Sequence, residues 1–371
     1  MVPVLTEETP VITAWSAISP WGLDSADFTT GLRSGKSAAL RLDPDLWETP
    51  FDEACVLPDF DIRAVLGRKG TRSMDRVSAL AVTAAGRLLD DGTGTRPAGI
   101  GEGTGLVLGT STGSAQSMMS FTRDSFVGDR PYLVDPARFP NTVMNCAAGQ
   151  SAIWHRLKGP NTTLAGGRGT GLLALRYGLR LQRAGRAETL LCGAVEEFSP
   201  ARAWLEWHAR GRRADQDSAG AGPLGEGAAL WLLERAGTAE RNGRRPLAVP
   251  LGLEFGFARD GGHIKDVLAD CLRRLLTRVE VAPREVGTVA DSGAGGAQGE
   301  AEHAALVEVF GAAVPDGPRS AASIGDTSAA SAAFQLTAVL ALAEPGTEGL
   351  ALITTVEANG VVGAALLSTR G

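Results

Sequence analysis

The chain is poor in the side chains that most often act as nucleophiles, bases or metal ligands. Its 371 residues include only four His and four Cys. The cysteines Cys55, Cys146, Cys192 and Cys271 lie far apart, so the sequence has neither a CxxC redox motif nor closely spaced zinc ligands. We therefore expect no metal site and interpret the cysteines as reduced thiols in packing roles.

Basic charge and long apolar runs are also lacking. Lys and Arg number 36 and Asp and Glu number 42, giving a formal net charge of −6 and no basic excess of the kind that favours nucleic-acid binding. No run of about 18 apolar residues is present, and residues 1–10 lack the basic and apolar regions of a secretory signal. We expect a cytoplasmic protein that binds neither nucleic acid nor membranes.

The remaining composition is typical of a large folded protein. Hydrophobic residues make up 44% of the chain and charged residues 21%. Aromatic residues account for only 5%, whereas Gly occurs 48 times. We expect a core built mainly from Ala, Val and Leu, with close backbone approaches at Gly. The polar, Gly- and Ala-rich segment 210–222 is the stretch that we expect to be loose.

Strand-like and helix-like segments alternate along the chain. Short apolar runs bounded by turn residues predict strands, and apolar residues at helical spacing predict helices. In the first half, strands are expected at residues 11–15, 105–109, 162–165 and 188–192, and helices at 73–89, 114–126, 147–157 and 172–185. In the second half, strands are expected at 247–257, 285–290, 350–354 and 363–368, and helices at 264–278, 300–310 and 328–343.

This alternation favours an α/β fold with mostly parallel strands. Because the second series repeats the rhythm of the first, the pattern suggests an internal duplication. We place the two halves at residues 1–246 and 247–371.

A Gly-rich loop at residues 166–171, with the sequence GGRGTG, joins an expected strand to an expected helix. Its glycines do not match GxGxxG, and no acidic residue ends the following strand, which disfavours a nucleotide site. The arrangement is typical instead of sites that present a nucleophile at a helix N-terminus, where backbone N–H groups stabilise an oxyanion. The residue at the apex is Arg168, which cannot serve as that nucleophile.

Several motifs in a fixed order resemble those of one enzyme family. They are Ser73-Met74-Asp75-Arg76, Pro140-Asn141 followed by Ala147-Ala148-Gly149-Gln150, Leu157-Lys158-Gly159-Pro160-Asn161, Gly225-Glu226-Gly227-Ala228, Glu302 with Val309-Phe310-Gly311, and Ser323-Ile324-Gly325. Together they resemble the β-ketoacyl synthase family over residues 11–368. The resemblance implies a thiolase-like fold, a five-layer αβαβα arrangement of two similar halves.

The catalytic positions of that family are all changed in this chain. By the resemblance, the family's nucleophilic Cys falls on Arg168, its first His on Asp291, its Lys on Ala321 and its second His on Asp326. A condensing enzyme needs a thiolate to hold the acyl chain and two His to support decarboxylation and the enolate. All four His of the chain lie at other positions. We therefore expect no catalytic residue here.

A ketosynthase scaffold without its catalytic residues resembles the chain length factors, the non-catalytic partners of type II polyketide ketosynthases. The resemblance implies a heterodimer with an active ketosynthase subunit, an acyl carrier protein that docks chiefly on that subunit, and no cofactor held by this chain. Chain length factors often carry Gln at the nucleophile position, and Arg168 departs from that pattern. The short segment 358–362 replaces the family's gate loop, which fits a subunit with no loop to gate.

The resemblance also implies where the chain meets its partner and the growing polyketide. The family dimerises through the strand that follows the GPN motif, here Thr162, Thr163, Leu164 and Ala165. The helix expected at 114–126 lies at that interface and lines the acyl tunnel. Candidate tunnel or gate residues are Met118, Met119, Thr122 and Phe126 on this helix, with Phe139 and Met144 after it. Alternatively, these are ordinary interface or core residues.

The charge of Arg168 allows a prediction of its own. A cation at a helix N-terminus is disfavoured by the helix dipole, and a buried lone charge is costly. Two of the changed positions carry carboxylates, Asp291 and Asp326, and in the family these positions converge on the nucleophile. We predict that Arg168 forms an ion pair with at least one of them. The alternative is three independent, solvated substitutions.

Two other functions stay open at this point. One is an active condensing enzyme or acyltransferase in which Cys146 is the nucleophile and Asp291 or Asp326 the base. The other is a homodimeric binding protein without a ketosynthase partner.

Overall fold

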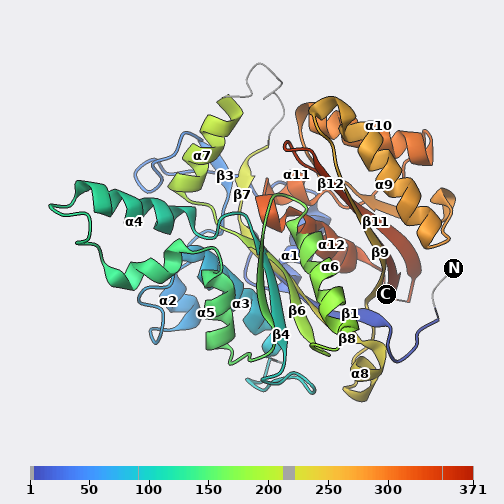
Figure 1. The fold of residues 1–371 in the computed structure, drawn as a ribbon, viewed down its shortest axis with the longest axis horizontal. Helices are drawn as coiled ribbons and strands as arrows, with labels where there is room; N and C mark the ends of the chain where they lie inside the picture. The colour runs from blue at the N-terminus through green and yellow to red at the C-terminus, as the bar shows by residue number, and fades with distance from the viewer. Residues whose placement is uncertain (1–3, 91, 212–221, 345, 371) are drawn as a thin grey trace.

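A nine-stranded sheet runs through the molecule (Figure 1), in the order β10-β11-β12-β9-β1-β8-β6-β4-β5. Its strands are β1 (Pro10–Ile18), β4 (Gly105–Thr110), β5 (Asn161–Ala165), β6 (Leu190–Glu196), β8 (Gly227–Arg235), β9 (Ala248–Phe257), β10 (Thr288–Ala290), β11 (Glu348–Val356) and β12 (Val361–Arg370). The computed structural model describes residues 4–90, 92–211, 222–344 and 346–370. Residues 212–221 of the segment expected to be loose therefore lie outside the described residues.

Helices cover the outer faces of the sheet and also fill the space between its two halves. The outer helices are α3 (Arg76–Leu89) and α5 (Cys146–Trp154) on the first half, and α9 (Ile264–Arg278) and α10 (Gly296–Phe310) on the second. Between the halves, α6 (Thr170–Arg183) packs against α12 (Ser331–Leu342). The order helix, sheet, helix, sheet, helix confirms the predicted five-layer thiolase-like fold.

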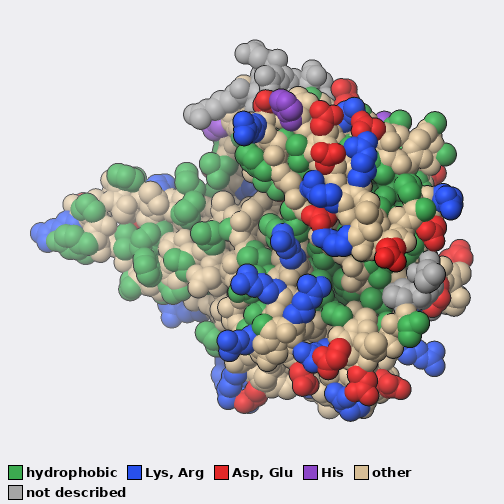
Figure 2. Space-filling model, turned by 45° about the vertical axis from the view of Figure 1, so that its right-hand side comes forward, with side chains coloured by type: hydrophobic (Ala, Val, Ile, Leu, Met, Phe, Trp, Pro, Cys, Tyr) green, Lys and Arg blue, Asp and Glu red, His purple; other side chains and the backbone are tan. Residues whose placement is uncertain are grey.

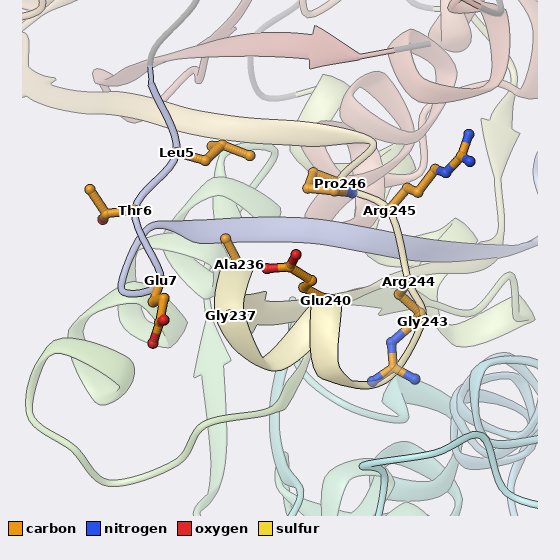
Figure 3. A pocket seen from close by; sticks show the side chains of 10 residues that line it. All are labelled: Leu5, Thr6, Glu7, Ala236, Gly237, Glu240, Gly243, Arg244, Arg245 and Pro246. Atoms are coloured by element: carbon orange, nitrogen blue, oxygen red, sulfur yellow. The ribbon is translucent and has the colours of Figure 1, made fainter.

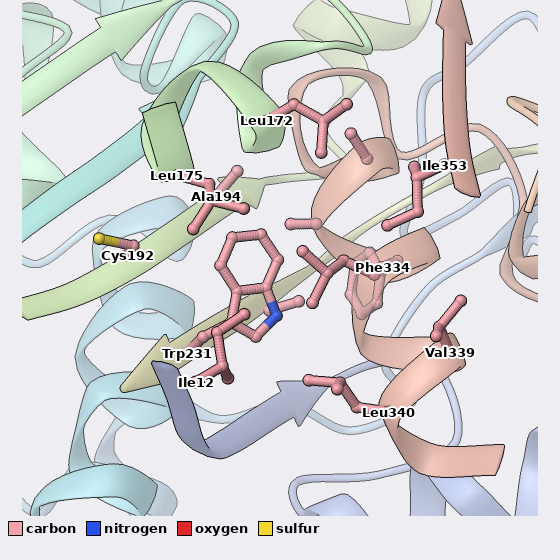
Figure 4. Packing of buried hydrophobic residues seen from close by; sticks show 14 of the residues in the cluster. Ile12, Leu172, Leu175, Cys192, Ala194, Trp231, Phe334, Val339, Leu340 and Ile353 are labelled. Atoms are coloured by element: carbon pink, nitrogen blue, oxygen red, sulfur yellow. The ribbon is translucent and has the colours of Figure 1, made fainter. Parts of the chain in front are cut away.

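Apolar side chains alternate between the two faces of the strands. In β8, Leu230 and Leu232 belong to the cluster beneath α3, whereas Trp231 and Leu233 belong to the central cluster around α6 and α12. Figure 4 shows Trp231 close to Phe334 of α12 in that central cluster. Burial of each such large side chain contributes about 1.5–3 kcal/mol. Strands with two apolar faces are expected in a sheet that helices cover on both sides.

The two halves of the sheet repeat one strand pattern. In the first half, β6 lies parallel to β4 and antiparallel to β8, and β8 is antiparallel to β1. In the second half, β11 lies parallel to β10 and antiparallel to β12, and β12 is antiparallel to β9. This repeat supports the suggested duplication. The boundary placed after residue 246 lies between α8 (Ala236–Arg241) and β9, and the division into halves stays a prediction.

The prediction of mostly parallel strands is wrong. Within the described part of the nine-stranded sheet, only the pairs β4–β5, β4–β6 and β10–β11 are parallel, and the other pairs are antiparallel. A turn at residues 357–360 joins β11 to β12, and so short a link permits only an antiparallel hairpin. The apolar run that forms β8 was not predicted as a strand, and β8 is antiparallel to both of its neighbours.

Other elements were not predicted from the sequence pattern. They include α1 (Ser25–Ser34), α2 (Ile62–Leu66), α7 (Pro200–Gly211), and the small sheet of β2 (Leu40–Arg41), β3 (Glu53–Cys55) and β7 (Leu224–Gly225). The predicted helix at 114–126 is α4 (Ala115–Val127), which is followed by the 3-10 helix η1 (Pro136–Thr142). Short helical segments complete the second half: η2 (Gly261–His263), η3 (Pro283–Glu285), α11 (Ser320–Ile324) and η4 (Ser328–Ala330).

Candidate functional site

The Gly-rich loop connects β5 to α6 at the centre of the molecule. Because α6 packs closely on α12, a Cβ atom on Gly171 would lie only 2.5 Å from the backbone nitrogen of Ala333. Gly is therefore required for this helix contact. The carbonyl oxygen of Arg168 accepts a hydrogen bond from the Ala332 N–H at 3.1 Å. The Gly-rich loop is thus fixed to the second half of the chain at Arg168.

Arg168 forms an ion pair with Asp326. Its Nη2 lies 2.5 Å from Oδ2 of Asp326, and the two side chains are 23% and 20% exposed. Oδ1 of Asp326 accepts a hydrogen bond from the Ser328 N–H at 2.9 Å. Gly325, which has a φ of 76°, makes the turn from α11 that brings Asp326 to this place. The predicted ion pair is therefore confirmed for Asp326.

Asp291 lies in a different contact. Its Oδ1 accepts a hydrogen bond from the Gly293 N–H at 3.0 Å, and in the described residues its side chain makes no ion pair with Arg168. Ala321 lies beside the same loop, since a Cβ atom on Gly293 would be 2.6 Å from that of Ala321. The four changed positions are thus arranged as Arg168 with Asp326, and Ala321 beside the loop of Asp291.

The electrostatics favour the charged forms of the ion pair. Burial raises the pKa of Asp326, but the charge and hydrogen bond of Arg168, the charge of Arg202 and the Ser328 N–H outweigh burial and lower that pKa to about 2. Burial lowers the pKa of Arg168, and the neighbouring carboxylate of Asp326 outweighs it, so that this pKa is raised. Both side chains are therefore ionised at neutral pH.

Glu357 occupies the N-terminus of α6. Its Oε1 accepts a hydrogen bond from the Gly169 N–H at 3.1 Å. Burial raises the pKa of Glu357, and the Gly169 N–H and the charge of Arg168 counter part of this rise. The amide that would face an oxyanion at this position is thus engaged by a carboxylate of the same chain. Sequence reasoning missed Glu357, although it directly precedes the segment 358–362 that replaces the gate loop.

Arg202 of α7 supports Asp326 from the buried side. Its guanidinium donates hydrogen bonds to the carbonyl oxygens of Glu197 at 2.8 Å, Gly225 at 2.6 Å and Asp326 at 2.8 Å. Near it, Glu196 is 1% exposed, and burial raises the pKa of its carboxyl group. Arg202 and Glu196 were also missed by the sequence analysis, because α7 was not predicted as a helix and Glu196 is part of a strand.

Glu302 lies beneath the Asp291 loop on α10. It is 2% exposed and accepts hydrogen bonds from the Ser292 N–H at 3.0 Å, the Ser292 hydroxyl and the Thr354 hydroxyl at 2.6 Å. Burial raises the pKa of Glu302 to about 7, despite these hydrogen bonds. A cavity of about 360 Å³ opens here, with Asp291 and Glu302 in its lining but neither Arg168 nor Asp326.

Comparison with known proteins identifies the family. The family described as "Beta-ketoacyl synthase, N-terminal domain" matches residues 8–239. The chain belongs to the β-ketoacyl synthase family. A solved structure described as "The ishigamide ketosynthase/chain length factor" is 41% identical, with a TM-score of 0.86, and the match covers 98% of this chain and 100% of that one.

Curated relatives of this chain are more distant. The 3-oxoacyl-[acyl-carrier-protein] synthase 2 of Vibrio harveyi is 25% identical over 269 residues, which cover 68% of this chain and 64% of that protein, less than two thirds of its length. The tetracenomycin polyketide synthase ketoacyl synthase alpha subunit of Streptomyces glaucescens is 27% identical over 286 residues, which cover 71% of this chain and 66% of that protein.

The predicted tunnel residues lie on a projecting arm formed by α4 and η1. Figures 1 and 2 show the arm extending from the body, with many hydrophobic side chains on its surface. Thr122 is exposed, and the exposed fractions of the others are 37% for Met118, 48% for Met119, 82% for Phe126, 58% for Phe139 and 50% for Met144. Their interpretation as core residues is therefore wrong, whereas their roles as tunnel or interface residues stay predictions.

The predicted interface strand lies at the edge of the sheet. β5 pairs with β4 on one side and ends the strand order on the other. The hydroxyl of Thr163 is buried and finds no hydrogen-bond partner among the described residues, while Ala165 is exposed. An unpaired edge of this kind is a template for a strand of another chain.

Cys146 is a poor candidate for a nucleophile. It is 9% exposed at the start of α5, and its Sγ lies 3.4 Å from Oδ1 of Asn141 and 3.8 Å from the Ser78 hydroxyl. Burial, followed by the charge of Asp75, raises the pKa of the Cys146 thiol. A raised pKa disfavours the thiolate, which is the reactive form.

The described residues form a surface groove that none of the predicted site residues lines, but neither a cluster of metal ligands nor a helix able to cross a membrane. A groove of about 540 Å³ lies between residues 5–7 and α8 (Figure 3), and its lining carries Glu7, Glu240 and Arg245. Across the described ranges, no group of three or more His, Cys, Asp and Glu side chains has the placement needed to hold a metal ion. No helix within those ranges has both the length and the apolar content needed to cross a membrane.

Proposed function

We propose that this chain is a non-catalytic chain length factor. It pairs with an active ketosynthase subunit and shapes the cavity in which a polyketide chain is elongated on an acyl carrier protein. The observation that carries the proposal is the Arg168–Asp326 ion pair at the position that falls, by resemblance, on the nucleophile of the family. The 41% identity to a protein described as a ketosynthase/chain length factor supports it.

The chemistry of the site supports a non-catalytic role. A guanidinium cannot hold an acyl group as a thioester, and the carboxylate of Asp326 is already engaged with Arg168 and Ser328. The Gly169 N–H, which would stabilise an oxyanion, is bound to Glu357. The rival proposal of an active condensing enzyme would depend on Cys146, whose thiol is buried and has a raised pKa.

Two features of the surface support a partner subunit. The open edge of β5 would pair with a strand of the ketosynthase and continue the sheet across the two chains. The arm carries further exposed apolar side chains: Val127 at 73%, Tyr132 at 67% and Leu133 at 62%. Apolar side chains exposed together in this way are typical of an interface that a partner covers. The carrier protein would dock chiefly on the ketosynthase, and the complex would act in the cytoplasm without a cofactor held by this chain.

Co-expression with a ketosynthase encoded by a neighbouring gene tests the pairing. We expect the two chains to co-purify and to form polyketide with acyl carrier protein and malonyl groups only when both are present. Ala165→Lys places an ammonium on the exposed end of β5 and should abolish co-purification, whereas Ala313→Lys, at another exposed Ala, should not. A pair that forms equally well with Ala165→Lys would contradict pairing through β5, and polyketide formed by this chain alone would contradict the non-catalytic role.

A further inference from the structure

An exposed aromatic surface is formed by α7 and the segment 46–51 that contacts it, and its residues belong neither to β5 nor to the arm. Its large apolar side chains are Leu46 at 75% exposure, Trp204 at 45%, Leu205 at 48% and Trp207 at 48%. The chain is only 5% aromatic, so this grouping departs strongly from its average composition. We call these four residues, together with Phe51, whose ring contacts that of Trp207, the α7 surface. Apolar side chains exposed together on a rigid element are typical of an interaction site.

The α7 surface is held in place by contacts within the chain. Trp204 Nε1 donates a hydrogen bond to the carbonyl oxygen of Glu48 at 3.1 Å. The rings of Trp207 and Phe51 meet edge to face, with centroids 5.7 Å apart. Since α7 is also anchored by the three hydrogen bonds of Arg202, the exposed rings are already ordered for binding.

The segment 40–53, which contacts α7 at Glu48 and Phe51, is rich in exposed carboxylates. Residues 40–53 carry five exposed acidic side chains and a single basic one, Arg41. The acidic residues are Asp43, Asp45, Glu48, Asp52 and Glu53. None of the five forms an ion pair with another described residue. Arg210 lies at the end of α7 with its guanidinium 5.1 Å from the Phe51 ring. The segment 40–53 is therefore predominantly negative, and we call it the acidic rim.

We propose that the α7 surface docks a basic amphipathic helix of another protein. Apolar side chains of that helix would cover Trp204, Leu205 and Trp207, and its Lys or Arg side chains would face the acidic rim. A second copy of this chain fits poorly, because two-fold pairing would oppose one acidic rim to another. A strongly acidic partner is disfavoured for the same reason. The proposal uses no residue of β5 or of the arm, which the resemblance places at the dimer interface, and it holds whether or not the chain is a chain length factor.

Binding of two designed peptides to the purified full chain tests the proposal. Both are labelled amphipathic helices of about 18 residues, or five turns, one built from Leu and Lys and the other from Leu and Glu. We expect the Leu–Lys peptide to bind, to shift the emission of the chain's tryptophans to the blue, and to dissociate as salt is raised. The Leu–Glu peptide should bind at least about tenfold more weakly.

Variants of exposed residues locate the binding. Leu205→Ser should weaken the Leu–Lys peptide by about tenfold, and Asp45→Lys combined with Glu48→Lys should reverse the preference between the peptides. Ile153→Ser, at a 79% exposed position of α5, is the matched control and should change neither affinity. Equal binding of both peptides, no binding of the Leu–Lys peptide, or equal effects of Leu205→Ser and Ile153→Ser would overturn the proposal. So would a dimer of this chain that Leu205→Ser converts to a monomer.

Discussion

At the scale of single residues, the site is explained by charge compensation. A guanidinium near a helix N-terminus is unfavourable unless an anion lies beside it, and Asp326 supplies that anion to Arg168. Asp326 in turn needs Arg168, because its carboxylate is four-fifths buried. Glu357 adds a second carboxyl group, whose Oε1 accepts a hydrogen bond from the Gly169 N–H. Arg168 and Asp326 therefore depend on each other, whereas Asp291 makes a separate contact.

This dependence predicts a coupled loss of stability. Arg168→Ala leaves a partly buried carboxylate unpaired, so we expect it to lower the free energy of unfolding by about 1–3 kcal/mol. The double variant Arg168→Ala, Asp326→Ala should lose less than the sum of the two single variants, as measured by urea unfolding. Arg138 and Asp124, an ion pair with side chains 55% and 30% exposed, form the control cycle and should be nearly additive. Additive losses at Arg168 and Asp326 would contradict the account.

Buried carboxyl groups predict how stability changes with pH. Burial raises the pKa of Glu197 to about 8 and of Glu302 to about 7, from 4.5. A carboxyl group with a raised pKa stabilises the folded state at pH values below its pKa in the unfolded chain. This contribution is lost as the pH rises through the folded-state pKa, which is about 7 for Glu302 and about 8 for Glu197. The depressed pKa of Asp326 acts in the opposite sense: its contribution is present above 3.8 and is lost as pH falls toward about 2.

We therefore expect the free energy of unfolding to decrease between about pH 5 and about pH 9. Glu302→Gln should make this decrease shallower, because the side chain no longer titrates. Glu300→Gln, at an exposed position of the same helix, serves as the control and should leave the slope unchanged. Chemical unfolding across this range measures the slopes. Identical slopes for the wild-type chain and Glu302→Gln would argue against the buried carboxyl as a source of the pH dependence.

At the scale of elements, helix α4 of the arm carries the residues predicted to line the proposed polyketide cavity. Met119, Thr122 and Phe126 recur at i, i+3 and i+7, so they share one face of α4. Their exposure in the single chain fits side chains that meet a partner and a substrate rather than a core. Bulky side chains at this position would end a tunnel, and small ones would extend it.

Met119→Ala, paired with the ketosynthase, is therefore expected to lengthen the polyketide product. Mass spectrometry of the products measures the effect directly. Val307→Ala on α10 removes an apolar side chain of the outer layer that is 36% exposed, and it should leave product length unchanged. A Met119→Ala pair that makes products of wild-type length would count against a gating role.

Some helices and strands could be predicted from the sequence pattern, and others could not. The amphipathic pattern of α9 predicts Ile264–Arg278, the range found in the structure. β8 escaped prediction because both of its faces are buried, so its apolar run lacks the alternation of a half-exposed strand. The role of Arg168 was predicted from charge, whereas that of Glu357 was not. Glu357 reaches Gly169 only through the antiparallel pairing of β11 and β12, which the alternation of strands and helices did not reveal.

At the scale of the whole molecule, the five layers bring the two halves together at one point. The loop before α6 belongs to the first half, and Asp326, Ala332 and Glu357 all belong to the second. The central core around α6 and α12 fixes this meeting point. The β5 edge follows from the same architecture, since it lies at the first-half end of the strand order.

The most direct test of the central claim is the intact mass of each subunit after the paired complex has been incubated with acyl-loaded carrier protein. Mass spectrometry separates the two chains and detects one added acyl group on either. We predict an acyl adduct on the ketosynthase and none on this chain, because Arg168 falls, by resemblance, on the nucleophile position and the Cys146 thiol is buried with a raised pKa. An acyl adduct on this chain, at Cys146 or elsewhere, would contradict the non-catalytic role.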